Sequence, residues 1–296
     1  MLSSCFNDHG PGDGNGPLLG LALNDPSNAW RTQLAAYAQS TAGSYSPYLQ
    51  HLATQAADAG EQAEQLVMMK GAGVRAVVIV PEGALDAAAV GGLISAGIKV
   101  FFCEEKLDVD YTGFVTFSNA EVGEKAGEWL AARTGVVKAA CLDISQNQPI
   151  SDARNDGFRS KLGDIPAVTL ECPYYSREAG KAATLAMLAD EKYSDVNAIY
   201  AQDDEVAFGV LDAIDQTPGS DVTFVIGCGG SKAFFDEISG RTDIALATTL
   251  YTPAMIKTSV NQAAVMLISG TEPAQKDTYL PVTVVDASNV ATEVPF

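Results

Sequence analysis

From Leu18 onward, short apolar runs alternate with amphipathic segments, and this alternation constrains the fold more than any other feature. The segments 120–134 and 177–191 are rich in Ala, Glu, Lys and Leu, with apolar residues three and four positions apart, and both are expected to be helices. Strands that alternate with helices and are apolar on both faces indicate parallel sheets covered on both sides. The expected strands are 18–23, 75–80, 99–103, 138–144, 167–172, 197–201, 223–227 and 244–249, with a weaker one near 48–53.

Two lobes fit this spacing better than one very wide sheet, because the pattern restarts after residues 114–119. We therefore expect an α/β chain with two doubly wound parallel-sheet lobes of five strands each. The extended segment 278–290 has no helix of its own and would serve as a strand crossing between the lobes. The predicted lobes are 18–117 plus 250–280 at the N-terminal side and 118–249 plus 281–296 at the C-terminal side.

The charge balance excludes two classes of partner. The chain has 37 Asp and Glu against 18 Lys and Arg, a net charge of −19, and no basic patch is visible in the sequence. Binding to nucleic acid or to anionic lipid headgroups is therefore not expected. No apolar run approaches the roughly 18 residues that a membrane-spanning helix needs.

The first residues, MLSSC, resemble the end of a bacterial lipoprotein signal. In that interpretation Cys5 is the lipidated first residue of the mature protein, and the polar, glycine-rich stretch up to residue 17 is a flexible tether. The alternative is an ordinary N-terminus with one free cysteine. The first interpretation predicts an exported protein, periplasmic or on the cell surface, that touches the membrane only through a lipid anchor.

The remaining cysteines do not form a metal-binding pattern. They lack Cys-x-x-Cys spacing, and both histidines, His9 and His51, are far from them in sequence, so no metal site is expected. Each lies in or at the end of a predicted strand, where cysteine packs as a small apolar residue. Neighbouring strands could bring Cys141 and Cys172 together as a disulfide, which export would permit. These four cysteines are Cys103, Cys141, Cys172 and Cys228.

Ligands of open parallel sheets bind beyond the carboxyl ends of the strands. The residues there are rich in aromatic rings, carboxylates and amides, with two arginines, Arg31 and Arg154. They include no Ser-His-Asp set and no histidine base, and the stretch 227–232 lacks the spacing of a phosphate-binding loop. Rings can cover the apolar faces of a sugar while charged and amide groups pair its hydroxyls. The pattern therefore indicates binding of a polyhydroxylated ligand, with no enzymatic activity and no cofactor.

Four segments, 73–102, 117–130, 152–158 and 198–214, together resemble the type I periplasmic sugar-binding proteins. These are the ribose/galactose-type solute receptors of ABC transporters, and the resemblance runs in order from Leu18 to Val290. It implies two lobes joined by a three-segment hinge, which close by hinge bending around a ligand in the cleft between them. It also implies a monomer that delivers a small sugar or polyol to an ABC permease.

The resemblance also assigns ligand-binding residues. Asn28 and Trp30 match hydrogen-bonding and stacking positions, and Arg31 matches variants known among receptors for furanose sugars. Arg154 matches an arginine that clamps a sugar oxygen, Tyr175 an aromatic wall, and Asp203 an amide or acid that binds ligand. The alternatives are a core role for the two rings, a surface position for Arg154, and simple helix capping for Asp203. Asp204 and Glu205 would begin the next helix, where acids suit the helix dipole.

Several site positions depart from the family pattern. Glu104 and Glu105 stand where many members have Asp-Arg, Gly229 replaces a common acid, and Tyr251 stands where a glutamine often binds. We therefore do not expect ribose or galactose itself. The predicted acids and arginines suit a neutral polyol, a sugar or an amino sugar, while Arg31 with Arg154 leaves a sugar acid open.

Three other function classes share this fold or scaffold. A LacI-type effector domain would need an N-terminal helix-turn-helix, and residues 1–17 are too short and glycine-rich to supply one. An α/β enzyme would need acid–base chemistry from Glu104 and Asp203. A sensory receptor reporting to a kinase or chemoreceptor could use the same lobes.

Overall fold

The computed structural model describes residues 16–296, and the chain forms two compact units. Unit 1 runs to Thr116 and includes Pro253–Leu280, whereas unit 2 comprises Phe117–Thr252 and Pro281–Phe296, so the chain passes between the units three times. The sequence predicted these boundaries after residues 117, 249 and 280, and the structure has them after 116, 252 and 280. Cys5 and nearly all of segment 1–17 lie outside the described residues.

Unit 1 is built on a six-stranded sheet in the order β11-β5-β4-β3-β1-β2. The pairs β1–β2, β1–β3, β3–β4 and β4–β5 are parallel. The strands β1, β3 and β4 are buried along most of their length, as their continuous apolar sequences predict. The bounds are β1 Leu18–Asn24, β2 Gln50–Ala56, β3 Ala76–Ile79, β4 Lys99–Cys103, β5 Gly113–Phe117 and β11 Asp277–Leu280.

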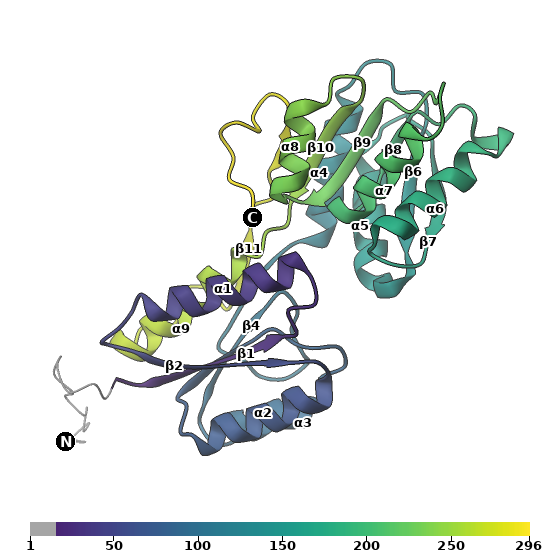
Figure 1. Ribbon diagram of the computed structural model, residues 1–296. Helices are drawn as coiled ribbons and strands as arrows, with labels where there is room; N and C mark the ends of the chain where they lie inside the picture. Colours follow the sequence, from purple (N-terminus) through teal and green to yellow (C-terminus); the bar gives the residue numbers. More distant parts are fainter. Residues whose placement is uncertain (1–15) are drawn as a thin grey trace, which may run out of the picture. The chain divides into compact units, whose positions relative to one another are not determined.

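Helices cover both faces of the unit 1 sheet. Figure 1 shows α1 (Ala29–Gly43) and α9 (Met255–Ser269) over one face and α2 (Ala59–Gly71) and α3 (Ala87–Ile94) beneath the other. Within residues 16–296 no helix combines the length and the apolar composition that crossing a bilayer requires.

Unit 2 repeats the plan, with a six-stranded sheet in the order β12-β10-β9-β8-β6-β7. The pairs β6–β7, β6–β8, β8–β9 and β9–β10 are parallel, whereas β10–β12 is antiparallel. Each sheet thus has six strands instead of the expected five, because the extended segment 278–290 contributes to both, as β11 and β12. The bounds are β6 Ala139–Ile144, β7 Ala167–Cys172, β8 Ala198–Tyr200, β9 Phe224–Gly229, β10 Ala245–Leu250 and β12 Val284–Asp286.

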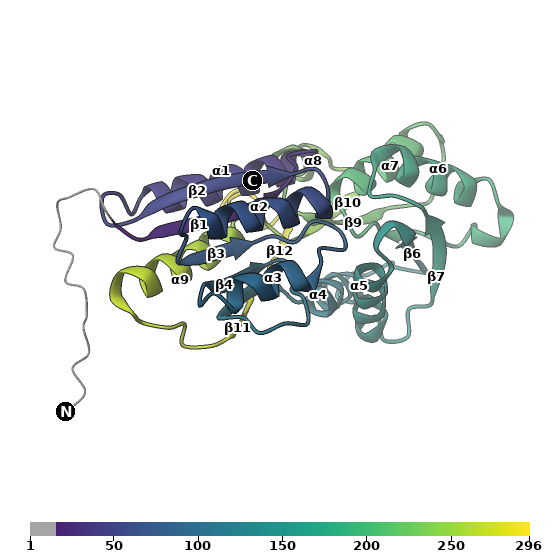
Figure 2. The same cartoon turned by 90° about the horizontal axis from the view of Figure 1, so that it is seen from below.

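The helices of unit 2 separate into two layers. Figure 2 shows α4 beside α5 and α6 beside α7. Two core clusters lie on opposite faces of the sheet, one around Phe158 and Tyr200 under α4 and α5, the other around Val206 and Phe234 under α6, α7 and α8. The α/β class with two parallel-sheet lobes is confirmed. The bounds are α4 Asn119–Ala131, α5 Gln148–Lys161, α6 Arg177–Leu188, α7 Asp204–Asp215 and α8 Lys232–Gly240, with short 3-10 turns at Ser145–Asn147 and Glu191–Tyr193.

The considered disulfide between Cys141 and Cys172 is wrong. Both cysteines are free and buried, although they lie on the neighbouring strands β6 and β7. Cys172 is opposite Ile144, and Cys141 is opposite Thr169. The two cysteines are therefore three residues out of register, about 10 Å along the strands, which is too far for a disulfide. The expectation that cysteines pack as small apolar residues is confirmed for the four described ones.

Glycine allows α4 and α5 to touch through their backbones. A Cβ on Gly123 would lie 1.9 Å from the carbonyl oxygen of Arg154, and a Cβ on Gly157 would lie 2.2 Å from that of Ala120. Both distances are below any real contact, so no larger side chain fits without moving a helix. This close packing fixes the position of α5, the helix that carries Arg154.

We predict that Gly123→Ala lowers the free energy of unfolding by about 1–3 kcal/mol, because the new methyl group overpacks the α4–α5 interface. Gly91→Ala in α3 is the matched control, since a Cβ there meets nothing within 4 Å. It should raise the free energy of unfolding by about 0.4–1 kcal/mol by restricting the unfolded chain. Urea denaturation measures both, and equal effects of the two substitutions would contradict the packing argument.

Candidate functional site

In unit 1, the loop after β1 presents the first group of predicted site residues. Asn28 is exposed and caps α1, its Oδ1 accepting a hydrogen bond of 2.8 Å from the Arg31 backbone N–H. Trp30 and Arg31 follow in the first turn of α1, and both are half-buried. The Arg31 guanidinium forms an ion pair of 2.9 Å with Glu82, on the loop after β3. Two neighbouring strand ends are therefore joined by opposite charges.

Two buried amides hold that second loop in place. Gln62, on α2, accepts a hydrogen bond of 2.8 Å from the Glu82 backbone N–H and donates one of 2.9 Å to the Val80 carbonyl. Asn24, at the end of β1, donates to the Pro81 carbonyl at 2.9 Å. Since these amides fix the backbone of the loop, they also fix the carboxylate that pairs with Arg31.

Glu104 and Glu105 follow β4 in the same sheet. Glu104 has a left-handed backbone, with φ of 73°, which is uncommon for any residue other than glycine. Its backbone N–H donates to the Val115 carbonyl at 3.0 Å, and its carbonyl accepts from the Thr116 hydroxyl at 2.8 Å. Glu104 is half-buried and Glu105 is exposed. The structure thus places both acids at the same sheet edge as Arg31, with β3 between their strands.

In unit 2, Arg154 is the most enclosed of the predicted residues. Its side chain on α5 is only 5% exposed, which excludes the surface alternative. The guanidinium donates through Nε to Asn119 Oδ1 at 2.9 Å and through Nη1 to the Gln202 carbonyl at 2.8 Å. Both acceptors are neutral oxygens, so these bonds orient the charge without neutralising it.

Two tyrosines lie near this guanidinium. The Tyr251 ring, which follows β10, has its centroid 4.9 Å from the Arg154 Cζ, within the range of a cation–π contact. Tyr175, which follows β7, is half-buried against the core cluster under α6 and α7. Its hydroxyl has no hydrogen-bond partner among the described residues, and burial raises its pKa to about 12 although the positive charge of Arg154 opposes the rise. Tyr175 therefore stays a neutral hydrogen-bonding group.

Asp203 caps α7. Its Oδ1 accepts hydrogen bonds from the backbone N–H groups of Glu205, at 2.8 Å, and Val206, at 3.3 Å. Burial, and then the neighbouring carboxylate of Asp204, raise the pKa of Asp203 to about 7, while the charge of Arg154 acts in the opposite direction. The capping alternative is thus part of the structure. Both capping bonds are accepted by Oδ1, and neither by the other carboxylate oxygen, Oδ2.

Asp204 begins α7 together with Glu205, as its position predicted, and it also has a second role inside unit 2. It is 4% exposed and accepts hydrogen bonds of 2.8 Å from the Gly230 and Ser231 backbone N–H groups and one of 2.7 Å from the Thr248 hydroxyl. Burial raises its pKa. A Cβ on Gly229, where φ is 140°, would lie 3.1 Å from the same carboxylate. Asp204 therefore fixes the ends of β9 and β10, and Gly229 leaves room for it.

The structure places the predicted site residues of the described chain on strand-end loops or on the first turns of the following helix, except Gly229, which is the last residue of β9. In unit 2, Tyr175, Asp203 and Tyr251 all lie within electrostatic reach of Arg154. Sequence reasoning did not assign the partner groups, which are Glu82, Asn119 and Gln202. Glu82 and Gln202 do follow apolar runs, so the strand-end rule could have included them, whereas nothing in the sequence marks Asn119.

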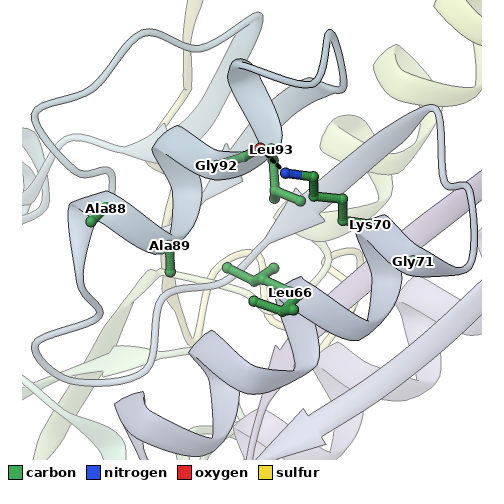
Figure 3. Close-up of a pocket in the computed structure, with 8 residues that line it drawn as sticks. Leu66, Lys70, Gly71, Ala88, Ala89, Gly92 and Leu93 are labelled. Atoms are coloured by element: carbon green, nitrogen blue, oxygen red, sulfur yellow. Dashed lines mark hydrogen bonds between the residues drawn. The ribbon is translucent and has the colours of Figure 1, made fainter.

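A separate apolar groove lies between α2 and α3 of unit 1. Figure 3 shows Leu66, Ala89 and Leu93 along it, with the Lys70 ammonium donating to the Gly92 carbonyl at 3.1 Å. The groove lies in the helix layer, away from the strand ends, and it lacks a set of polar groups that would orient a small ligand. We do not assign the ligand site to it.

The raised pKa of Asp203 predicts a pH-dependent stability. An unfolded aspartate loses its proton near pH 3.9, whereas folded Asp203 keeps it up to about pH 7, so the contribution of Asp203 to stability should fall as pH rises between these values. Asp203→Asn cannot titrate and still caps the helix. Relative to wild type, its free energy of unfolding should therefore increase from about pH 4.5 to about pH 7.5. Asp58→Asn, at the exposed cap of α2, is the control, and parallel pH profiles of Asp203→Asn and wild type would refute the assignment.

Comparison with known proteins identifies the family of this chain. A family model described as periplasmic binding protein domain matches residues 19–272. The ribose import binding protein RbsB of Bacillus subtilis is 25% identical over 217 residues, which cover 72% of this chain and 69% of that protein.

Solved structures show the same fold. A periplasmic ribose ABC transporter protein from Conexibacter woesei has a TM-score of 0.81 at 19% identity, covering 95% of this chain and 96% of that one. A periplasmic solute-binding protein of an ABC transporter from Actinobacillus succinogenes, with bound D-allose, has a TM-score of 0.80 at 18% identity, covering 94% and 100%. Since the family model spans residues 19–272, most of the chain, the protein belongs to the periplasmic binding protein family.

Proposed function

We propose that this protein is an exported solute receptor that binds a small sugar or polyol and delivers it to an ABC permease, without chemical turnover. The observation that carries the proposal is the environment of Arg154. A buried guanidinium is oriented by two neutral oxygens, lies against the Tyr251 ring and has Tyr175 and Asp203 nearby. Fixed donors, acceptors and rings are what a polyhydroxylated ligand needs, because an unmatched buried hydroxyl costs about 1–3 kcal/mol.

Each unit supplies one set of contacts in this proposal. Unit 2 contributes Arg154 with Tyr175, Asp203 and Tyr251, and Gly229 at the end of β9. In unit 1, the Trp30 ring stacks on the ligand, while polar groups beside it pair hydroxyls. The remaining unit 1 residues are Asn28, Arg31, Glu104 and Glu105.

The charges narrow the ligand class. Arg31 is already paired with Glu82, and Glu104 and Glu105 add negative charge at the same edge of unit 1. Unit 2 offers Arg154 beside the titrating carboxyl of Asp203. A neutral sugar or polyol, or an amino sugar, fits this balance better than a sugar acid, because a ligand carboxylate would meet acids in unit 1. Ribose import by the relative from Bacillus subtilis and D-allose bound in the solved neighbour agree with this class.

Trp30→Ala and Arg154→Ala should each weaken binding about tenfold or more. A hydrogen bond to a charged group contributes about 1.5–3 kcal/mol, and a stacked ring contributes about 0.5–1.5 kcal/mol beyond the apolar area that it buries. Isothermal titration calorimetry with D-ribose, D-allose and myo-inositol measures the effect, after circular dichroism has shown that each variant is folded. The controls keep the same helices but change residues away from the strand ends. Tyr37→Ala removes a ring that lies 3.7 Å from the Lys257 ammonium, and Arg159→Ala removes a bond to Thr169.

Affinity that is unchanged in folded Arg154→Ala would remove unit 2 from the proposed site. A comparable loss in Arg159→Ala would mean that α5 acts on binding only through its stability.

We also propose that the protein is held at the membrane by a lipid on Cys5, which lies outside the described residues. Cys5→Ser should shift the protein from the membrane fraction to the soluble fraction of the producing cell, because a lipid anchor then cannot form. Fractionation followed by immunoblotting measures the shift. Continued membrane association of Cys5→Ser would refute the anchor while leaving the ligand proposal intact.

A further inference from the structure

Gln202 connects the end of β8 to the cap of α7. Its backbone is left-handed, with φ of 63°, and the side chain is completely buried. Among the described residues that are not glycine, only Glu104 shares a positive φ. This conformation is strained for an L-residue with a side chain, so the surrounding contacts must hold it in place.

The side-chain amide of Gln202 supplies those contacts. Its Nε2 donates to the Leu142 carbonyl at 2.6 Å and to the Ser151 hydroxyl at 3.1 Å. A carbonyl oxygen can only accept, so the amide orientation follows from chemistry and is not ambiguous. Leu142 is on β6 and Ser151 is on α5, and the amide therefore ties residue 202 to both elements.

The backbone carbonyl of Gln202 is the acceptor of Arg154 Nη1, at 2.8 Å. Arg154 is on α5, one turn after Ser151, which is itself bonded to the Gln202 amide. Side chain and backbone of one residue thus contact the same helix at two points. A shift of the left-handed backbone would turn the carbonyl away from Arg154.

We infer that Gln202 is a positioning residue that sets the direction of the Arg154 guanidinium, and through it the ligand-binding geometry of unit 2. The part that concerns ligand rests on the proposed function, whereas the effect on Arg154 does not. A glycine at 202 would adopt a φ of 63° without strain, but it would lose the bonds of Nε2. We therefore expect Gln202→Gly to loosen the Arg154 guanidinium, because the lost amide bonds matter more than the relieved backbone strain.

The test measures Arg154 directly. In side-chain ¹⁵N spectra, the Arg154 Nε–Hε signal is identified by its absence in Arg154→Lys. In the wild type, burial and the bond to Asn119 should slow exchange of this proton with solvent. In Gln202→Gly, exchange should accelerate about tenfold or more and the signal should shift, as expected for the loss of one hydrogen bond to a charged group.

Gln202→Glu gives a second variant of nearly the same size. It replaces the Nε2 donor with a carboxylate oxygen, which cannot donate to the Leu142 carbonyl. Gln202→Glu should therefore disturb the Arg154 signal, also where Gln202→Gly is too unstable to study. Ile238→Val is the control for general loosening, because Ile238 belongs to the core of the same unit and lies on α8, a helix that carries none of these hydrogen-bonding groups. Wild-type exchange of Arg154 Hε in folded Gln202→Gly or Gln202→Glu, or equal acceleration in Ile238→Val, would overturn the inference.

Titration of the same variants with D-allose, D-ribose and myo-inositol separates the two proposals. Faster Arg154 exchange together with weaker binding supports both. No binding of any sugar or polyol to the wild type would count against the proposed function, and the exchange result would still decide the role of Gln202.

Discussion

The buried charge of Arg154 is the constraint on which unit 2 depends. A guanidinium that is 5% exposed must be hydrogen-bonded, because an unpaired buried charge is strongly destabilising. Its acceptors come from two different elements, Asn119 at the start of α4 and Gln202 after β8. The α4–α5 contact therefore has to be close, and Gly123 makes it so. The close packing of α4 on α5 therefore serves both the fold of unit 2 and the orientation of Arg154 in the candidate site.

The two arginines of the candidate site are held differently. Arg31 in unit 1 pairs with the carboxylate of Glu82, so much of its charge is balanced within the protein. Arg154 in unit 2 is bonded to neutral oxygens, and its charge acts outward on Asp203 and Tyr175. A ligand oxygen near Arg154 would be attracted by a positive charge that no hydrogen-bonded carboxylate neutralises. In the proposed site, unit 2 therefore offers the ligand an unpaired positive charge, whereas Arg31 of unit 1 is already paired.

Periodicity was enough to predict the parallel sheets, since apolar runs and helices alternate along the chain, and the strand-end rule selected Arg154 and Asp203. The same rule could have included Glu82 and Gln202, but not their pairing, because Arg31–Glu82 and Arg154–Gln202 join residues that are 51 and 48 positions apart. The disulfide failed for a related reason. Neighbouring strands were expected, but a register that puts Cys172 opposite Ile144 depends on packing that no local pattern carries. Asp204 begins α7 as predicted, but its buried bonds to Gly230 and Thr248 could not be predicted, because these partners lie 26 and 44 positions along the chain.

Thermal unfolding of the purified protein against a panel of pentoses, hexoses, polyols, amino sugars and sugar acids tests the central claim most directly. The protein should first be unfolded and refolded, so that no co-purified ligand fills the site. A matching sugar or polyol at 100 times its Kd should add about 2.7 kcal/mol of stability and visibly raise the melting temperature. The account predicts such a rise for one stereochemical group of neutral or amino sugars or polyols. An unchanged melting temperature across the whole panel would contradict it.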